Sequence, residues 1–340
     1  MSIGTLVSGS MTINPLPSQG ALQTGLDFRR IAIVAVKALI SIGLIAFLAT
    51  RLDYTRLLSY WSTFNGIWIL GAIAVLLLEM CAIAGVRLKL MLAYVDARRA
   101  LTTTVQIALC GFFFEQVTIG FVGGDAVRLW LLRQADVPLG RAIPTLVLDR
   151  TCGSASLLLL SLLGAHALLA LLDEPLRARI VDTLVVVVAV GGIGVVVAFA
   201  LMKLLPLSKL TGPWRRPSSR GQAANIIVLA IVFVLAATTH LLNIFVFWML
   251  GQSLGLSMTF NQWFIVVPTV LLISMLPISI GGWGVREGAM VVALHGFGVP
   301  AEEALLPSIL FGLCAAIATL PGGIFWVTSK KTIGENTGAH

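Results

Sequence analysis

The sequence has little charge for its length. Only 11% of the 340 residues are charged, against about 25% in a typical soluble domain. Hydrophobic residues make up 58% of the chain, and the mean hydropathy is +0.99. This composition argues against a soluble domain. No ten-residue segments of alternating hydropathy occur, which argues against a membrane β-barrel.

Several catalytic and binding motifs are also missing. The sequence has no GxxxxGK[ST] phosphate loop, so ATP-driven pumping by this chain alone is not expected. It has no HExxH or GxSxG motif, so no catalytic residues are assigned and no enzyme is predicted. The four cysteines show no CxxC pair and no metal-ligand spacing with histidine, so neither a metal nor a cofactor is expected. No basic patch with interleaved aromatic residues is present, so no nucleic-acid partner is predicted.

The sequence does contain apolar segments, several of which are long enough to cross a bilayer as helices. They are Ile31–Thr50, Gly66–Gly85, Leu101–Leu132, Ala142–Leu172, Thr183–Leu205, Ala224–Leu250, Trp263–Gly296 and Ala304–Thr328. Residues 1–28 precede them and are predicted to be a disordered tail. The chain is therefore predicted to be an integral membrane protein.

Two of these segments are interrupted by the same short motif. Residues 123–128 read GGDAVR and residues 281–286 read GGWGVR. A Val-Pro pair follows each motif, at Val137-Pro138 and at Val299-Pro300. The repetition predicts two related membrane halves, which comprise residues 29–172 and 183–328, with residues 329–340 as a cytoplasmic tail.

Basic residues orient the segments, because cytoplasmic loops carry an excess of Lys and Arg. Basic groups at residues 29–30, 87–99, 203–220 and 330–331 are placed inside, and the acidic loop near Asp173 outside. The number of crossings then requires each interrupted segment to enter and leave on one side, with the glycine pair as the reversal. The predicted fold is an all-α polytopic membrane protein of two inverted-topology repeats, each with three full transmembrane helices and one re-entrant hairpin. Both termini are predicted to be cytoplasmic.

Charged residues at membrane depth are the candidate functional residues. A guanidinium fork matches phosphate oxygens, and glycine turns let backbone N–H groups approach an anion. Two interpretations stay open: Arg128 and Arg286 contact an anionic substrate, or each only pairs with an acidic neighbour and holds its turn. The candidate substrate-binding residues are Glu115, Gly123, Gly124, Asp125, Arg128, Asp149, Arg150, Gly281, Gly282, Arg286 and Glu287.

Two carboxylates raise a separate question. Glu79 lies in the middle of an apolar segment, where it needs a partner or a proton, and Lys37 in the preceding segment is the candidate partner. Glu115 lies about two helical turns before the first glycine pair, where a protonatable carboxylate is able to couple transport to protons.

The second motif, within Leu276–Gly288 and followed by Gly298-Val299-Pro300, resembles the C-terminal signature of the lysylphosphatidylglycerol synthase membrane-region family of flippase-like proteins. Residues 123–128, Arg133 and Asp149-Arg150 resemble that family's first signature, although this chain has Glu115-Gln116 where the family usually has Asn and Pro. The 340 residues contain no segment that resembles the aminoacyl-transferase domain of the bifunctional members, so lysyl transfer is not expected.

This resemblance implies a translocator of an anionic lipid or a lipid-linked intermediate in the bacterial inner membrane. Lipid is the expected partner, and an oligomer is compatible with the sequence. The alternative is an integral-membrane enzyme or an accessory subunit that acts on a polyprenyl-phosphate carrier or in lipid biosynthesis.

Overall fold

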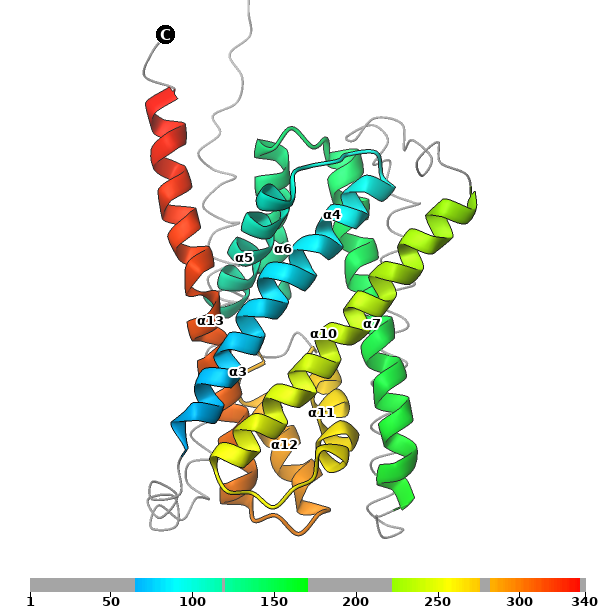
Figure 1. The fold of residues 1–340 in the computed structure, drawn as a ribbon, viewed down its shortest axis with the longest axis vertical. Helices are drawn as coiled ribbons and strands as arrows, with labels where there is room; N and C mark the ends of the chain where they lie inside the picture. The colour runs from blue at the N-terminus through cyan, green and yellow to red at the C-terminus, as the bar shows by residue number, and fades with distance from the viewer. Residues whose placement is uncertain (1–64, 118–119, 171–221, 276–281, 337–340) are drawn as a thin grey trace, which may run out of the picture. The chain divides into compact units, whose positions relative to one another are not determined.

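The computed structural model describes residues 65–117, 120–170, 222–275 and 282–336. All the regular secondary structure in these ranges is helical, as the sequence predicts (Figure 1). The helices are α3 (Gly66–Leu78), the π-helical turn η2 (Glu79–Ala84), α4 (Gly85–Tyr94), α5 (Leu101–Val117), α6 (Gly120–Gln134), α7 (Leu139–Ala170), α10 (Gln222–Ser253), α11 (Phe260–Ser274), α12 (Val285–His295) and α13 (Ala301–Asn336).

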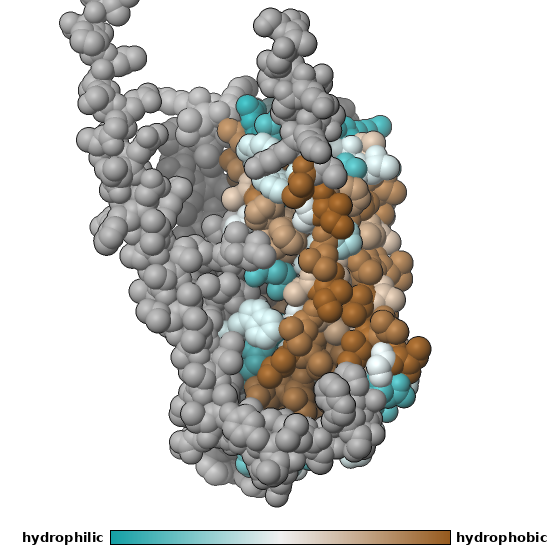
Figure 2. Space-filling model, turned by 90° about the vertical axis from the view of Figure 1, so that its left-hand side faces the viewer, coloured by the Kyte–Doolittle hydropathy of each residue, from teal (hydrophilic) through white to brown (hydrophobic). Residues whose placement is uncertain are grey.

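Four helical stretches in the described residues are long and apolar enough to cross a membrane. They are Gly66–Tyr94, Leu139–Gly164, Ala224–Ser253 and Ala301–Val327. Figure 2 shows one face of the molecule, on which hydrophobic residues cover most of the coloured surface, with hydrophilic residues at its two ends and in smaller groups between them. The prediction of a polytopic helical membrane protein is therefore confirmed. The predicted spans Ile31–Thr50 and Thr183–Leu205 lie outside the described residues.

The first described span is longer than the sequence predicts. The Asn65 side chain accepts a hydrogen bond from the backbone N–H of Ile67 (3.2 Å) and so caps α3. The helix then continues through η2 into α4 and ends at Tyr94. The assignment of Arg87 and Lys89 to a cytoplasmic loop is therefore wrong, because both lie within α4. The helix continues past its apolar part because Arg87 is paired inside the protein.

The first glycine pair lies inside a helix, so the prediction that it forms a reversal is wrong. α5 ends at Val117 and α6 begins at Gly120, and both Gly123 and Gly124 belong to α6. A Cβ atom on Gly124 would overlap the side chain of Glu115 and would lie 2.6 Å from the carbonyl oxygen of Gly111. Here glycine is required for the close approach of α6 to α5, and not for its backbone freedom.

The second glycine pair precedes a helix. α11 ends at Ser274 and α12 begins at Val285. Gly282 and Gly284 both have positive φ angles, +79° and +85°, which only glycine adopts without strain. Gly281 lies outside the described residues. At this site the prediction of a special glycine backbone agrees with the structure.

Helix α13 contacts both short-helix pairs, at opposite ends. Near its start, Ser308 and Gly312 lie against Arg286 and the Trp283 ring beside α12. Farther along, a Cβ atom on Gly322 would overlap the backbone carbonyl of Leu109 in α5. Residues 308 and 322 are fourteen positions apart, which corresponds to about 20 Å of helix. The two short-helix pairs therefore pack on different halves of α13.

Helix α7 has the same double role. Near its start, Asp149 and Arg150 bond to side chains of α4, α5 and α6. Farther along, a Cβ atom on Gly164 would lie 3.0 Å from the carbonyl oxygen of Ile265 in α11. Each of these two long helices thus connects the α5–α6 pair to the α11–α12 pair.

Candidate functional site

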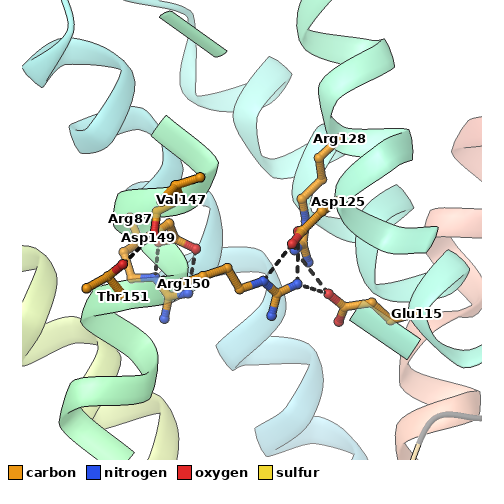
Figure 3. A network of polar contacts seen from close by, with 8 residues as sticks. All are labelled: Arg87, Glu115, Asp125, Arg128, Val147, Asp149, Arg150 and Thr151. Carbon is orange, nitrogen blue, oxygen red and sulfur yellow. Dashed lines mark hydrogen bonds and ion pairs between the residues drawn. The ribbon is translucent and has the colours of Figure 1, made fainter. Parts of the chain in front are cut away.

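Six charged side chains, called the first network below, lie near one another between α4, α5, α6 and α7 and form two hydrogen-bonded groups (Figure 3). Three are arginines and three are carboxylates, so their formal charges cancel. They are Arg87 from α4, Glu115 from α5, Asp125 and Arg128 from α6, and Asp149 and Arg150 from α7. A charged cluster among apolar helices is a candidate functional site because isolated charges are costly at membrane depth.

One part of the network is a bidentate pair. Arg87 donates from Nε to Asp149 Oδ1 (2.6 Å) and from Nη2 to Asp149 Oδ2 (2.8 Å). The Nε–Nη2 edge of the guanidinium thus meets both oxygens of the carboxylate, which makes this a strong type of ion pair. The pair joins α4 to the first half of α7, and the Nε–Nη2 edge of Arg87 is occupied by this contact.

In the other part, two guanidiniums share two carboxylates. Arg150 donates from Nε and Nη2 to the two oxygens of Asp125, both at 2.9 Å, and it also donates from Nη2 to Glu115 Oε1. Arg128 donates from Nη1 to Asp125 Oδ1 (2.8 Å) and to Glu115 Oε1 (3.1 Å). Asp125 Oδ1 and Glu115 Oε1 each therefore accept from both arginines, from Nη2 of Arg150 and from Nη1 of Arg128.

Small residues make room for this part of the network. A Cβ atom on Gly111 in α5 would overlap the guanidinium of Arg128, and one on Gly124 would overlap Glu115. The Arg128 guanidinium also lies 4.8 Å from the centre of the Phe112 ring, a favourable cation–π distance. Gly111 and Gly124 therefore allow two charged side chains to fit between closely packed helices.

The network is open on one side. The side chains of Arg150 and Asp125 are 29% and 28% exposed, whereas those of Arg128 and Glu115 are 8% and 13% exposed. An incoming anion would therefore meet Arg150 first, with Arg128 behind it. The arrangement is able to bind a phosphate or a carboxylate, provided that the ligand replaces the protein's own carboxylates.

The second motif forms a smaller, sealed network. Arg286 donates from Nη2 to Glu287 Oε1 (2.7 Å), from Nε to Ser308 Oγ (2.9 Å) and from Nη2 to the Ser308 carbonyl oxygen (3.1 Å). Ser308 Oγ in turn donates to Glu287 Oε1 (2.9 Å). The side chains of Arg286 and Glu287 are only 6% and 1% exposed.

Aromatic rings and a helix cap complete this second network. The Arg286 guanidinium lies 5.2 Å from the centre of the Trp283 ring and 5.3 Å from that of Phe311. Glu287 Oε2 accepts a hydrogen bond from the backbone N–H of Gly284 (2.5 Å), which caps α12. Both oxygens of Glu287 thus accept hydrogen bonds, and two nitrogens of Arg286 donate while two aromatic rings lie beside its guanidinium. This arrangement suits a role in holding the structure together.

The predicted site residues therefore divide into two groups. Glu115, Asp125, Arg128, Asp149 and Arg150 belong to the first network, and Gly124 lies between them. Among the described residues, no hydrogen bond or ion pair joins the first network to Arg286 or Glu287. Both acidic neighbours named from the sequence, Asp125 and Glu287, do pair with their arginines.

Sequence reasoning missed three contributors, which are Arg87, Gly111 and Ser308. Arg87 and Ser308 are polar residues beside or within apolar segments, and that position is the signal that points to them. Gly111 carries no such signal, because its role depends on where Arg128 lies. In the described ranges, no group of three or more His, Cys, Asp or Glu side chains is arranged to hold a metal ion.

Comparison with known proteins agrees with the membrane architecture. Residues 34–323 match the protein family described as the lysylphosphatidylglycerol synthase TM region. The match covers most of the 340 residues, including both glycine–arginine motifs and both networks. No curated protein matches the chain.

Proposed function

We propose a transport function for this chain, which belongs to the family of lysylphosphatidylglycerol synthase transmembrane regions. In this proposal the protein moves an anionic lipid or a lipid-linked intermediate between the leaflets of the bacterial inner membrane. The family supports a membrane protein related to lipid biosynthesis or lipid flipping. The observation that carries the transport proposal is the partly open arginine–carboxylate network held among membrane helices.

The network suits a head group that enters and leaves. Arg150, through its Nε–Nη2 fork, and Arg128, through Nη1, donate to the same carboxylates, and a phosphate has the geometry to replace those oxygens. Asp125, which is partly exposed, then turns away and returns when the head group leaves. Exchange between a protein carboxylate and a ligand phosphate keeps the buried arginines paired throughout, and the extra negative charge falls on Asp125, which is partly exposed.

We assign different roles to the two motif arginines. Arg128 and Arg150 contact the head group, because they line the open network. Arg286 holds the start of α12 against α13, because Glu287, Ser308 and two aromatic rings already surround its guanidinium. This differs from a mechanism in which Arg128 and Arg286 bind the head group in turn.

We also propose that the α5–α6 and α11–α12 pairs are re-entrant hairpins that enter from opposite faces, and that both termini are cytoplasmic. The short lengths of these helices support this, because none of them is among the four candidate spans. Their packing on opposite halves of α7 and α13 supports the inverted relation between the repeats.

Reconstitution tests the transport proposal. Vesicles that contain fluorescently labelled phosphatidylglycerol and the purified full-length protein are treated with a membrane-impermeant quencher. We expect inner-leaflet label to become accessible with the wild-type protein. Arg150→Lys should slow this about tenfold, the equivalent of ~1.4 kcal/mol, because an ammonium loses the planar fork.

The control is Arg133→Lys, since Arg133 is exposed in the last turn of α6. It should match the wild-type rate. Label that stays as protected as in protein-free vesicles contradicts the proposal, and a covalently altered lipid favours the enzyme alternative.

Cysteine labelling tests the topology. In a cysteine-free background, Arg133→Cys and Arg141→Cys place thiols at the end of α6 and the start of α7. We expect both to react with an impermeant reagent only from the cytoplasmic side. Labelling from outside intact cells would show that the first hairpin is assigned to the wrong face.

A further inference from the structure

Glu79 is a buried carboxylate outside both networks. It is 4% exposed and lies near the middle of the span Gly66–Tyr94. At 1.5 Å per residue, either end of that helix is about 20 Å away. A carboxylate is too short to reach water over this distance, so its charge must be compensated inside the protein or removed by a proton.

The described residues offer Glu79 little compensation. Its hydrogen-bond donor is Asn243 Nδ2 on α10, at the long distance of 3.4 Å, and the same amide also donates to the Thr239 carbonyl oxygen at 3.0 Å. Arg87 is the charge that acts on Glu79 electrostatically, from two helical turns along the same span. Arg87 is already bound by both oxygens of Asp149.

Lys37, the partner expected from the sequence, lies outside the described residues. On the described helices packed against η2, the other titratable groups do not provide a counter-charge. Cys110 on α5 donates to the Gly322 carbonyl oxygen, and Glu115 on the same helix is held by arginines. His240 on α10 bonds to the Gly153 carbonyl oxygen. Cys81 on η2 itself and Lys89 and Tyr94 on α4 complete the set, and within the described residues none forms an ion pair with Glu79.

The backbone is irregular at the same point. The π-helical turn η2 begins at Glu79 and interrupts an otherwise α-helical span. Single π-helical turns occur frequently at functional sites. On α10, one helical turn before Asn243, the buried hydroxyl of Thr239 has no hydrogen-bond partner in the described part of the chain. A weakly bonded carboxylate and a π-helical turn thus coincide near the middle of the span, and an unpaired hydroxyl lies one turn from the amide that contacts Glu79.

We propose that Glu79 is a proton-binding site, which holds a proton at neutral pH and releases it when water reaches the π-helical turn. Once ionised, Glu79 competes with Asp149 for Arg87, and the weakened Arg87–Asp149 pair changes the electrostatic field at Arg150, the next residue along α7. Lipid movement is in this way coupled to proton movement. The coupling rests on the proposed transport function, whereas the proton site itself does not.

Infrared difference spectroscopy of the purified full-length protein tests the proton site directly. We expect the wild-type protein at neutral pH to show the carbonyl stretch of a protonated carboxylic acid, with the shift that exchange into D₂O causes. Glu79→Gln should lack this band and should still fold, because an amide resembles the neutral acid in shape. A wild-type protein without the band has an ionised Glu79, and the proposal is then overturned.

Asp136→Asn is the matched control, because Asp136 is exposed and has a φ of 56°, which Asn tolerates. It should keep the band. A band that survives in Glu79→Gln belongs to another carboxyl group and also overturns the proposal.

A pH gradient across the vesicles described above tests the coupling. The wild-type rate of labelled phosphatidylglycerol movement should change by up to about tenfold per pH unit for one coupled proton. Glu79→Gln should move the lipid without responding to the gradient. An equal response in both proteins, or a response to Na⁺ in place of pH, overturns the coupling. Lipid that does not move even with wild-type protein refutes the transport function, while the infrared result still decides the proton site.

Discussion

In the first motif Gly124 lies inside α6, close to the backbone of α5, whereas in the second Gly282 precedes α12 with a φ of +79°. Arg128 belongs to a network of six charged side chains that is open at Arg150, and Arg286 belongs to a sealed contact with one carboxylate and one hydroxyl. The two motifs share Gly, Gly, Val and Arg at matching positions. The glycines of the first motif allow close helix packing, and those of the second allow a special backbone conformation.

A single position on the long helices accounts for part of this difference. Arg150 follows Pro138 by twelve residues, and Gly312 follows Pro300 by twelve. In the first half that position supplies a second guanidinium. In the second half a Cβ atom there would lie 2.6 Å from Arg286 Nη2 and from the Trp283 ring. This position therefore separates the proposed head-group site of the first network from the structural contact of Arg286.

The largest contrast should appear when each motif arginine is removed. Arg286→Ala leaves Glu287 buried without its cation, so we expect a loss of about 3–5 kcal/mol in the free energy of unfolding. Arg128→Ala leaves Asp125 and Glu115 with Arg150, so the loss should be nearer 1.5–3 kcal/mol, roughly the value of hydrogen bonds to charged groups. Unfolding in detergent micelles measures both, and equal losses would remove the distinction between the two motifs.

The glycines should respond differently to the same two substitutions. At Gly282 the obstacle is the positive φ angle, because an added Cβ atom would lie 3.4 Å from Ser274 Cβ, an ordinary contact. Gly282→Asn should therefore be better tolerated than Gly282→Ala. At Gly124 the obstacle is space, so Gly124→Ala should be better tolerated than the larger Gly124→Asn. Each unfavourable variant should lose about 1–3 kcal/mol. Melting temperatures that rank Ala and Asn alike at both positions would show that one mechanism operates at both.

Removal of a hydroxyl should have a smaller effect. Ser308→Ala leaves Arg286 Nε without its 2.9 Å partner in a buried site, at a cost of about 1–2 kcal/mol. Ser156→Ala is the control, because that hydroxyl is equally buried but bonds only to the Gly153 carbonyl oxygen of its own helix. Its loss should be measurably smaller in the same unfolding experiment. If Ser156→Ala loses as much stability as Ser308→Ala, the contact between Ser308 and Arg286 adds nothing to the free energy of unfolding.

The smallest expected effect concerns the bidentate pair of the first half. Arg87→Lys keeps the charge but loses one of two hydrogen bonds to Asp149, so we expect about 0.5–1.5 kcal/mol of destabilisation. A double-mutant cycle with Asp149→Asn measures the coupling free energy. A coupling near zero would mean that the pair does not hold α4 to α7.

The features that the sequence predicts correctly are those with local causes. Uninterrupted apolar residues mark the spans, and the Asp125–Arg128 pair follows from three-residue spacing on a helix. Contacts across long separations are not encoded locally: Arg87 and Asp149 are 62 residues apart, and Arg150 and Glu115 are 35 apart. A glycine pair suits either a turn or a close helix crossing, so its sequence alone did not identify Gly124 as an interior helix position.

Helix ends show the same limit. The predicted span ended at Gly85 because polar residues follow it, yet the helix runs to Tyr94. Likewise α13 continues to Asn336, through residues 329–336 of the predicted tail. Hydropathy reports the apolar part of a helix, and a helix does not have to stop where its surroundings change from lipid to protein or water.

The cancellation of charge in the first network has an electrical consequence. Three arginines and three carboxylates contribute no net charge, so a bound monoanion makes the loaded site negative by one unit. Passage of that charge through the full membrane potential is worth ~2.3 kcal/mol per 100 mV, which biases its distribution about fifty-fold. Passage together with one proton would be electroneutral and would respond to the pH difference alone. In the proposed transport, the voltage dependence of the lipid movement therefore distinguishes a lipid that moves alone from one that moves with a proton.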